Sequence, residues 1–431
     1  MSLRRQWSFT MLSLDVMIFA LLVWATQRIV AFDACKKSDE TCSANHNDYS
    51  DFVGRYTFPT TPIRAVECRS EEAIAEMTKG VPIVLKNCHF GEITQGWTFE
   101  YLKQNLLSPN LTVYKSPTRR FLFYNRENSR EIIENITWSP PHNVTEMSFL
   151  QFLNQIDELE KAGNGTKAYL QSSLEKESLN SDMQDDVLMF NTKWLKDMKE
   201  KLSWGRLDVN LFLIGMGGVV TPAHYDIMEN LFLQIHGKKR CILFSPENYK
   251  FLYPYPVYHP HDRQTQVNFD FPDFKKFPKF RNITGVDAVV GPGDVLYIPN
   301  YWWHYIESES DSRTISMNFW YLPKDAEDEL VEDAKIAAEE EQVESIGSEK
   351  EPNGKSGEQG KEDKSEIEDK EEKMEEEGEK QFNKTRPDAY TAGELIGLSR
   401  DIEAMVGEAL NDVKKVGAFL KELVDGRFDH V

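Results

Sequence analysis

Three side chains of this chain have the types and spacing of a metal centre. His224 and Asp226 form a His-x-Asp pair, and His304 follows further along the chain. Two imidazoles and one carboxylate make up the facial triad that holds Fe(II) and leaves the remaining coordination positions open to other ligands. A His-x-Asp pair is common, however, and a later histidine can be coincidence, so the surrounding sequence has to decide.

The residues around the triad have the character of short strands. If the chain after Thr221 is extended, His224 and Asp226 project to the same side, because alternate residues of a strand share a face. Pro222 favours the start or the edge of a sheet. Further strands, separated by turn residues, are predicted over residues 211–214, 230–236, 239–244, 295–298 and 314–320. Many short strands of this kind predict a mainly β fold, with a double sheet of the jelly-roll or cupin type.

Helices are predicted on both sides of this core. Residues 70–79 and 147–161 have helical character, and Ser148 is placed to cap the second segment. Near the C-terminus, apolar residues repeat at helical spacing over 395–409 and 413–424. Two amphipathic helices at this end can either cover the barrel or pair between two copies of the chain.

Several longer stretches resemble the JmjC class of 2-oxoglutarate oxygenases. They are Thr221-Pro222-Ala223-His224-Tyr225-Asp226, the turn Gly291-Pro292-Gly293-Asp294, and Trp302-Trp303-His304. Residues 240–244, 252–257, 262–264 and 318–321 are similar to asparaginyl hydroxylases of the factor-inhibiting-HIF type. The resemblance covers about residues 56–323 and resumes at about 386–428. It implies a double-stranded β-helix core with surrounding helices and a C-terminal helical pair.

The resemblance assigns a co-substrate site to this chain. His224, Asp226 and His304 would be the Fe(II) ligands, with 2-oxoglutarate and O₂ as co-substrates. Lys239 would bind the distal carboxylate of 2-oxoglutarate, a role that suits a compact ammonium charge. Strand alternation separates Lys239 from Lys238 and Arg240, which would face away. The other positions that match co-substrate contacts of the family are Tyr169, Thr221, Asn230 and Asn318.

The resemblance also implies a protein substrate with a target asparagine. The matching substrate contacts are Gln171, Arg263, Gln264 and Trp320. The side chain of Gln264 offers both a donor and an acceptor, so it could clamp the carboxamide of the target. One departure concerns Phe123, which stands where the family usually has tyrosine and removes a hydroxyl near the pocket.

Three functions remain open on the sequence. The leading hypothesis is β-hydroxylation of asparaginyl residues in proteins, of the HIF-α or ankyrin-repeat type by resemblance. N-methyl-lysine demethylation uses the same triad, and a cupin-like binding module could retain the fold without catalysis. The intact triad with Lys239 argues against the binding module, and Gln264 with Trp320 favours the hydroxylase.

The charge of the chain is concentrated in one segment. The 431 residues carry a net charge of −21, and residues 325–380 contain 24 acidic and 8 basic residues with almost no aromatic ones. Such a segment cannot bury enough apolar surface to fold, so a disordered acidic insertion is predicted over 324–385. It separates the oxygenase domain, 56–323, from a C-terminal helical region, 386–431. The family dimerises through that region, and Leu420 matches an interface position. No basic patch for nucleic acid is seen.

The N-terminus carries features of a secretory-pathway protein. Arg4 and Arg5 precede an apolar run over residues 16–25, which predicts a signal peptide or signal anchor over 1–32, followed by a linker over 33–55. Six Asn-x-Ser/Thr sequons, about twice the number expected by chance, begin at Asn110, Asn135, Asn143, Asn164, Asn282 and Asn383. Cys35 and Cys42 could pair in an oxidising compartment, whereas Cys68, Cys88 and Cys241 could be core thiols. A location in the endoplasmic reticulum or secretory pathway, or anchored to a membrane, is therefore expected. The cytoplasm and nucleus, typical of the enzyme that the chain resembles, stay open as the alternative.

Overall fold

The computed structural model describes residues 49–90, 96–125, 138–173, 179–190, 193–324, 327–328, 390–410 and 412–424. The predicted N-terminal signal segment, the possible Cys35–Cys42 pair and nearly all of the predicted acidic insertion lie outside these residues. Among the described residues, no helix has both the length and the apolar character needed to cross a membrane.

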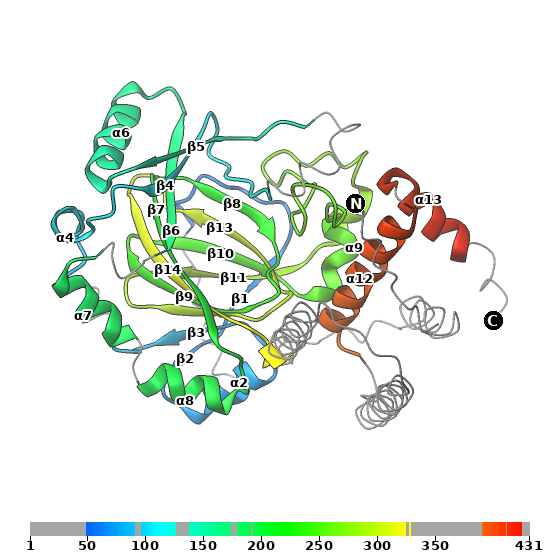
Figure 1. Cartoon of the computed structure of the whole chain (residues 1–431), viewed down its shortest axis with the longest axis horizontal. Helices are drawn as coiled ribbons and strands as arrows, with labels where there is room; N and C mark the ends of the chain where they lie inside the picture. Colours follow the sequence, from blue (N-terminus) through cyan, green and yellow to red (C-terminus); the bar gives the residue numbers. More distant parts are fainter. Residues whose placement is uncertain are drawn as a thin grey trace, which may run out of the picture.

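Two β-sheets form the centre of the molecule (Figure 1). The smaller sheet has five strands, in the order β1 (Thr60–Pro62), β11 (Gly285–Val290), β10 (Lys239–Phe244), β13 (Trp303–Ser308) and β8 (Val220–His224). The larger sheet has nine strands, in the order β2 (Ala65–Glu67), β3 (Ile83–Lys86), β12 (Val295–Ile298), β9 (Glu229–His236), β14 (Thr314–Tyr321), β7 (Leu207–Gly215), β6 (Lys167–Ser173), β4 (Leu111–Ser116) and β5 (Asn143–Met147). The predicted mainly β fold with a jelly-roll core is confirmed.

The central strands follow from the apolar runs that flank the turns. All six residues of β10 are buried, and this strand pairs antiparallel with β11 on one side and β13 on the other. Gly237 and Gly293 adopt positive φ angles of 69° and 88° in the turns that lead into β10 and β12. These angles favour glycine, which explains why the turn residues mark the strand ends in the sequence.

Helices cover the edges of the double sheet. The helices before β7 are α2 (Glu71–Thr78), α4 (Phe99–Asn105), α6 (Phe149–Ala162), α7 (Ser181–Phe190) and α8 (Lys193–Lys201). Ser70 caps α2 through a side-chain contact with the Ala73 amide, and Ser148 forms a capping box with Gln151 at the start of α6. The predicted helices at 70–79 and 147–161 are therefore confirmed, together with the role of Ser148. The shorter elements are η3 (Pro246–Asn248), α9 (Tyr249–Leu252) and η4 (Pro278–Asn282).

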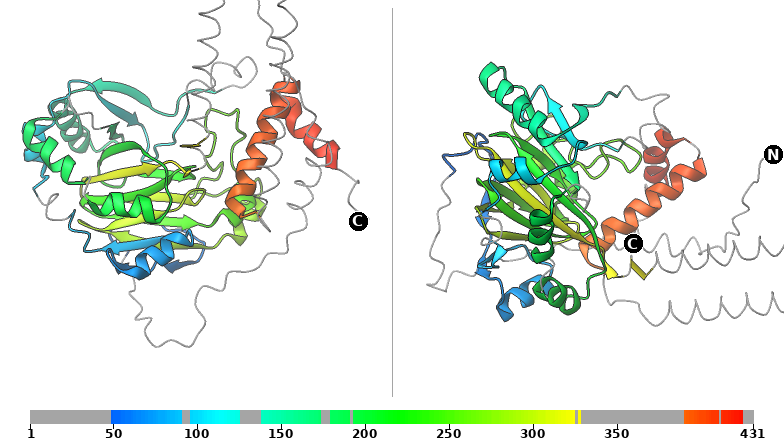
Figure 2. Two further views of the ribbon diagram at one scale, coloured as in Figure 1. Left: turned by 60° about the horizontal axis from the view of Figure 1, so that its bottom comes forward. Right: turned by 60° about the vertical axis from the view of Figure 1, so that its left-hand side comes forward.

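The two C-terminal helices, α12 (Ala392–Leu410) and α13 (Val413–Val424), stand at the opposite end of the double sheet from α4, α6 and α7 (Figure 1, Figure 2). Buried Ile402, Val406 and Val416 form a small apolar cluster between them. The helix α12 also contacts the core through Ile396, which belongs to the apolar cluster beneath the smaller sheet. In addition, Arg400 donates hydrogen bonds of 2.6 and 2.8 Å to the two carboxylate oxygens of Asp262. This helix therefore covers the barrel, one of the two roles predicted for it.

The cysteines correct one expectation. Cys68 and Cys88, predicted as possible core thiols, are joined in a disulfide. Parallel pairing of β2 with β3 brings the ends of these strands together, and both cysteines follow those ends. Cys241 is a buried free thiol, so the prediction of a core thiol is confirmed at this position.

Candidate metal centre

Strand pairing brings the two histidines of the triad together. His224 is the last residue of β8, and it lies opposite His304 of β13 in the antiparallel register. The two imidazole centroids are 4.1 Å apart, and His304 Nε2 lies 3.6 Å from Asp226 Oδ2. One ligand atom from each of the three residues falls within 4.8 Å of the others. Since β8 ends at His224, Asp226 lies just beyond the strand, which corrects the expectation that the pair shares a strand face.

Both imidazoles are oriented by the backbone two residues before them. His224 Nδ1 lies 2.9 Å from the carbonyl oxygen of Pro222, and His304 Nδ1 lies 3.0 Å from that of Trp302. A carbonyl oxygen only accepts, so Nδ1 carries the proton in each ring and Nε2 presents its lone pair. Metal-binding histidines are commonly held in this way.

The electrostatics of the triad favour the protonation states that a metal requires. Burial, and then the neighbouring His304, lowers the pKa of His224 to about 4, so its imidazole is neutral near pH 7. Burial alone would raise the pKa of Asp226, but the charges of His224, His304 and Arg263 and the Trp320 hydrogen bond lower it on balance. An ionised carboxylate beside a neutral imidazole is the form that coordinates a cation.

Two of the predicted substrate contacts lie beside the carboxylate of the triad. Trp320 donates its indole N–H to Asp226 Oδ2 over 3.2 Å, and Arg263 Nη1 lies 3.8 Å from Asp226 Oδ1. Arg263 adopts a positive φ of 64° in the loop before Gln264. Both side chains therefore position the ligand carboxylate, a role that the sequence did not indicate.

A cavity of about 340 Å³ opens onto the triad. Apart from Asn230, every residue predicted for the metal, co-substrate or substrate lines it: Tyr169, Gln171, Thr221, His224, Asp226, Lys239, Arg263, Gln264, His304, Asn318 and Trp320. Asn230 lies behind this wall, where its Oδ1 accepts a hydrogen bond of 3.2 Å from Asn318 Nδ2. Phe123, the departure from the family pattern, also lines the cavity and is 47% exposed.

Lys239 brings a buried positive charge into this cavity. Its side chain is 1% exposed, and Nζ donates to Ser316 Oγ over 2.8 Å and to Tyr169 OH over 3.2 Å. Within the described part of the chain, no carboxylate forms an ion pair with it. A buried charge without a counter-ion is strongly unfavourable, so the geometry fits an anion bound at this end of the cavity.

The neighbours of Lys239 face away from the cavity, as strand alternation predicted. Arg240 pairs with Asp287 at 3.0 Å, and Lys238 pairs with Asp51 at 3.3 Å on the surface. Ser316 was missed by the sequence reasoning, although it lies two and four residues before Asn318 and Trp320 on β14. Alternation along that strand was the signal that could have found it.

Several buried polar atoms at the cavity lack a protein partner. Among the described residues these include Gln264 Oε1 and Asn318 Oδ1, both on cavity-lining side chains, and Asn230 Nδ2 behind them. His142 Nδ1 is a further one, on a lining residue that the sequence did not single out. Buried polar atoms are nearly always hydrogen-bonded, so these groups indicate the position of a polar ligand.

A double sheet with a two-histidine, one-carboxylate site in the wall of its cavity defines a cupin-type protein. The cupin-like domain family matches residues 70–328, and the chain belongs to this family. Over 107 residues, the chain is 40% identical to lysine-specific demethylase 8 of Danio rerio. Over 109 residues, it is 38% identical to JmjC domain-containing protein D of Dictyostelium discoideum. The predicted membership of the JmjC class is thereby confirmed. The more specific resemblance to the factor-inhibiting-HIF type is not supported by these relatives.

Other relatives cover different shares of the chain. HSPB1-associated protein 1 of Homo sapiens is 42% identical over 109 residues, which are 25% of this chain and 22% of that protein. tRNA wybutosine-synthesizing protein 5 of Gallus gallus is 26% identical over 255 residues, which are 57% of this chain and 73% of that protein. The match to the demethylase covers 25% of this chain and 26% of that protein. This chain therefore spans about a quarter of the length of both HSPB1-associated protein 1 and the demethylase. Similarity of this extent supports the domain and leaves the substrate open.

Proposed function

We propose that this chain is an Fe(II)- and 2-oxoglutarate-dependent protein hydroxylase that acts on asparaginyl residues. The observation that carries the oxygenase part is the shared cavity of Lys239 and the triad. A facial set of three ligands leaves metal positions open, and a buried ammonium in the same cavity needs an anion. A dicarboxylate that chelates a metal at one end and meets a cation at the other satisfies both requirements.

Each residue has a defined task in this proposal. His224, Asp226 and His304 would hold the iron, and Lys239, with Tyr169 and Ser316, would hold the distal carboxylate of 2-oxoglutarate. When bound, the iron would supply the redox chemistry that divides O₂ between succinate, formed as 2-oxoglutarate loses CO₂, and a substrate C–H bond. Apolar side chains of the cavity wall, among them Phe232 and Ile306, exclude water from this reaction.

The preference for asparagine rests on Gln264. Its side chain is 2% exposed, and its backbone forms a bridge with His224, next to the metal ligands. Its Oε1 has no partner among the described residues and lies on a cavity-lining side chain. The N–H group of a target carboxamide could donate to this oxygen, which supports an asparaginyl substrate.

The test uses the purified full chain with Fe(II), 2-oxoglutarate and asparagine-containing peptides. We expect release of succinate and CO₂, and a peptide mass gain of one oxygen located on asparagine. The same peptides with alanine in place of asparagine are the control and should remain unmodified. Gln264→Leu should lose the peptide product while it retains slow, uncoupled succinate release, and Gln104→Leu, at an exposed position of α4, should behave like the wild type.

Two outcomes would replace the proposal. Formaldehyde release from N-methyl-lysine peptides without a hydroxylated product would favour the demethylase, a name carried by one of the relatives. Absence of succinate with every peptide, in protein that retains its metal, would favour the binding module. Each outcome has its own readout, so the three functions are distinguished in one series.

A further inference from the structure

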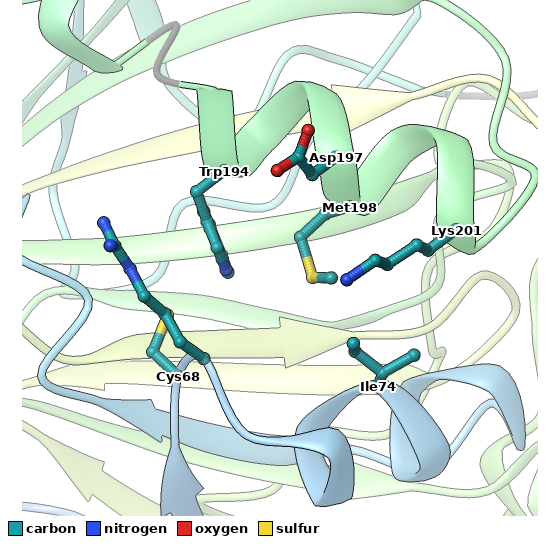
Figure 3. A pocket seen from close by; sticks show the side chains of 7 residues that line it. Cys68, Ile74, Trp194, Asp197, Met198 and Lys201 are labelled. Atoms are coloured by element: carbon teal, nitrogen blue, oxygen red, sulfur yellow. The ribbon is translucent and has the colours of Figure 1, made fainter.

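The disulfide between Cys68 and Cys88 is a buried structural link. The two side chains are 1% and 5% exposed, and the amide of Cys68 donates to the carbonyl oxygen of Lys86 over 2.9 Å. Cys68 borders a cavity of about 380 Å³ between α2 and α8, opposite Trp194 and Met198 (Figure 3). Structural disulfides of this kind form and persist in oxidising compartments and are rare in the cytosol.

The sequons supply an independent observation. Four of the six sequon asparagines belong to described residues, and all four are exposed: Asn110, Asn143, Asn164 and Asn282. The buried asparagines of the described chain, Asn105, Asn230 and Asn318, all lie outside sequons. A glycan is bulky and hydrated, so a usable acceptor must be on the surface of the folded protein.

The four asparagines lie in a turn or at the ends of secondary-structure elements. Asn164 lies in the turn between α6 and β6, flanked by Gly163 and Gly165 with φ angles of 59° and 82°. Its side-chain oxygen accepts the amide proton of Thr166 over 3.0 Å, a contact that does not use the nitrogen to which a glycan is attached. The other three lie just before β4, at the first residue of β5 and at the last residue of η4. None of the four lines the cavity of the triad.

We propose that this chain is N-glycosylated at Asn110, Asn143, Asn164 and Asn282 and that it folds in an oxidising compartment, where the disulfide forms. The donor is an oligosaccharide attached to a lipid through a diphosphate. The asparagine amide nitrogen bonds to the anomeric carbon of the sugar, the bond from that carbon to the diphosphate oxygen breaks, and the amide loses one proton. Cys68 and Cys88 lose two protons and two electrons to a disulfide of the folding compartment.

The proposal is independent of catalysis, because none of these residues belongs to the candidate metal centre. The cavity keeps its lining whether or not the surface is glycosylated. The remaining cysteine of the described chain, Cys241, is fully buried in β10, so it is shielded from the same oxidants. The described chain thus contains one buried thiol, Cys241, and one disulfide, between Cys68 and Cys88.

The experiment expresses the full chain in eukaryotic cells and treats it with peptide-N-glycosidase in heavy-oxygen water. We expect a decrease in apparent mass on the gel and heavy-oxygen-labelled aspartate at the four positions by mass spectrometry. A denatured, unreduced sample treated with a thiol reagent should be labelled at Cys241 and not at Cys68 or Cys88. Four unlabelled asparagines in the recovered protein, or labelled thiols at both Cys68 and Cys88, would overturn the proposal.

A matched pair of variants separates glycosylation from folding. Thr166→Ala destroys the sequon at Asn164, whereas Thr166→Ser keeps it. Both variants keep the backbone N–H of residue 166 that donates to the Asn164 side-chain oxygen. We expect loss of one glycan in the alanine variant only. Equal mobility of the two variants, with Asn164 unlabelled in both, would overturn the assignment of that site.

Discussion

At the scale of single residues, the candidate site depends on how each ligand is held. Each histidine of the triad places its Nδ1 proton on a carbonyl oxygen two residues earlier, and Asp226 accepts the indole proton of Trp320. These contacts fix the direction of the metal-facing atoms before a metal arrives. Preorganisation of this kind keeps the ligand set in one geometry and reduces the cost of binding.

The first prediction removes one ligand at a time. His224→Ala or Asp226→Ala should abolish 2-oxoglutarate turnover and weaken Fe(II) binding by at least about 10- to 100-fold, the loss typical even of supporting residues around a metal. Binding is measured by anaerobic titration, and circular dichroism checks that the fold is retained. The exposed His236 at the end of β9 is the control, because His236→Ala removes an imidazole outside the site. Near wild-type turnover in either ligand variant would rule out this triad.

The second prediction separates Lys239 from its neighbour. Lys239→Ala should raise the 2-oxoglutarate concentration needed for half-maximal turnover by roughly 10- to 150-fold, because a charge-assisted contact contributes about 1.5–3 kcal/mol. Lys238→Ala should change it little, since Lys238 pairs with Asp51 at the surface. Titration of both variants with 2-oxoglutarate decides the matter. Equal effects would mean that the dicarboxylate binds elsewhere.

The third prediction concerns a half-buried carboxyl group on β9. Burial raises the pKa of Glu229 from 4.5 to about 7, and hydrogen bonds from Tyr297 and Asn300 offset only part of this effect. Folding therefore favours the protonated form of Glu229. The destabilisation from its ionised form is absent below about pH 4.5, grows as the pH rises, and is complete above pH 7. Glu229→Gln keeps an acceptor for Tyr297, so it should raise the free energy of unfolding by about 1–3 kcal/mol at pH 8 and little at pH 4.5.

Urea denaturation at the two pH values measures this difference. The exposed Glu158 of α6 is the matched control, because Glu158→Gln makes the same chemical change in solvent. A gain for Glu229→Gln that is equal at both pH values would contradict the role of ionisation.

At the scale of elements, the helix α12 positions a loop of the candidate site. Arg400 holds the carboxylate of Asp262 with two hydrogen bonds and donates to Tyr225 OH over 3.1 Å. Asp262 directly precedes Arg263 and Gln264, which line the cavity. Gly407 of the same helix packs so closely that a Cβ there would lie 2.4 Å from the Tyr258 ring. The helix and the loop are therefore packed against each other through both polar and apolar contacts.

The fourth prediction follows from this contact. Arg400→Ala should lower kcat/KM for the peptide by roughly 10-fold, about 1.4 kcal/mol, and leave the KM for 2-oxoglutarate nearly unchanged. Arg400→Lys should recover part of the loss, because lysine keeps the charge and loses the bidentate geometry. Arg206→Ala, which removes an exposed arginine 3.6 Å from Asp208, is the control. A parallel loss for peptide and 2-oxoglutarate would indicate general destabilisation of the fold.

The sequence predicted those elements whose signals are local. The strand at 239–244 has the predicted bounds, because an apolar run between turn residues defines both of its ends. Ser148 caps α6 as predicted, and Ser70 caps the helix that was predicted to begin there. The known motif pointed to His224, Asp226 and His304, and strand alternation separated Lys239 from Lys238 and Arg240.

The sequence did not reveal features that depend on distant parts of the chain. The disulfide of Cys68 and Cys88 depends on the parallel pairing of β2 with β3, which spacing does not indicate. The end of β8 at His224 depends on pairing with β13, so Asp226 was placed on a strand that it follows. The contact of Trp320 with Asp226 joins residues 94 positions apart. Long-range pairing determines each of these features.

At the scale of the whole molecule, we propose that the C-terminal helices pair two copies of the chain. Within one copy, Leu420 packs partly buried against the cluster of Ile402, Val406 and Val416. Leu420→Arg would therefore disturb the helix pair itself as well as any dimer. Met405 and Phe419 are 50% and 40% exposed on these helices, so they remain available to a second copy. Residues 339–380 lie outside the described chain, and their acidic composition predicts a spacer without core contacts.

The last prediction compares an exposed residue with the acidic segment. Phe419→Arg should convert a dimer to a monomer without changing the circular dichroism spectrum, because arginine at this position meets solvent in one copy and an apolar surface in the dimer. Deletion of residues 339–380 should leave the dimer intact. Lys415→Glu, on an exposed position of the same helix, is the control. Light scattering on the four proteins measures the mass, and a wild-type monomer would refute the pairing, whereas a monomeric deletion variant would show that the acidic segment contributes to it.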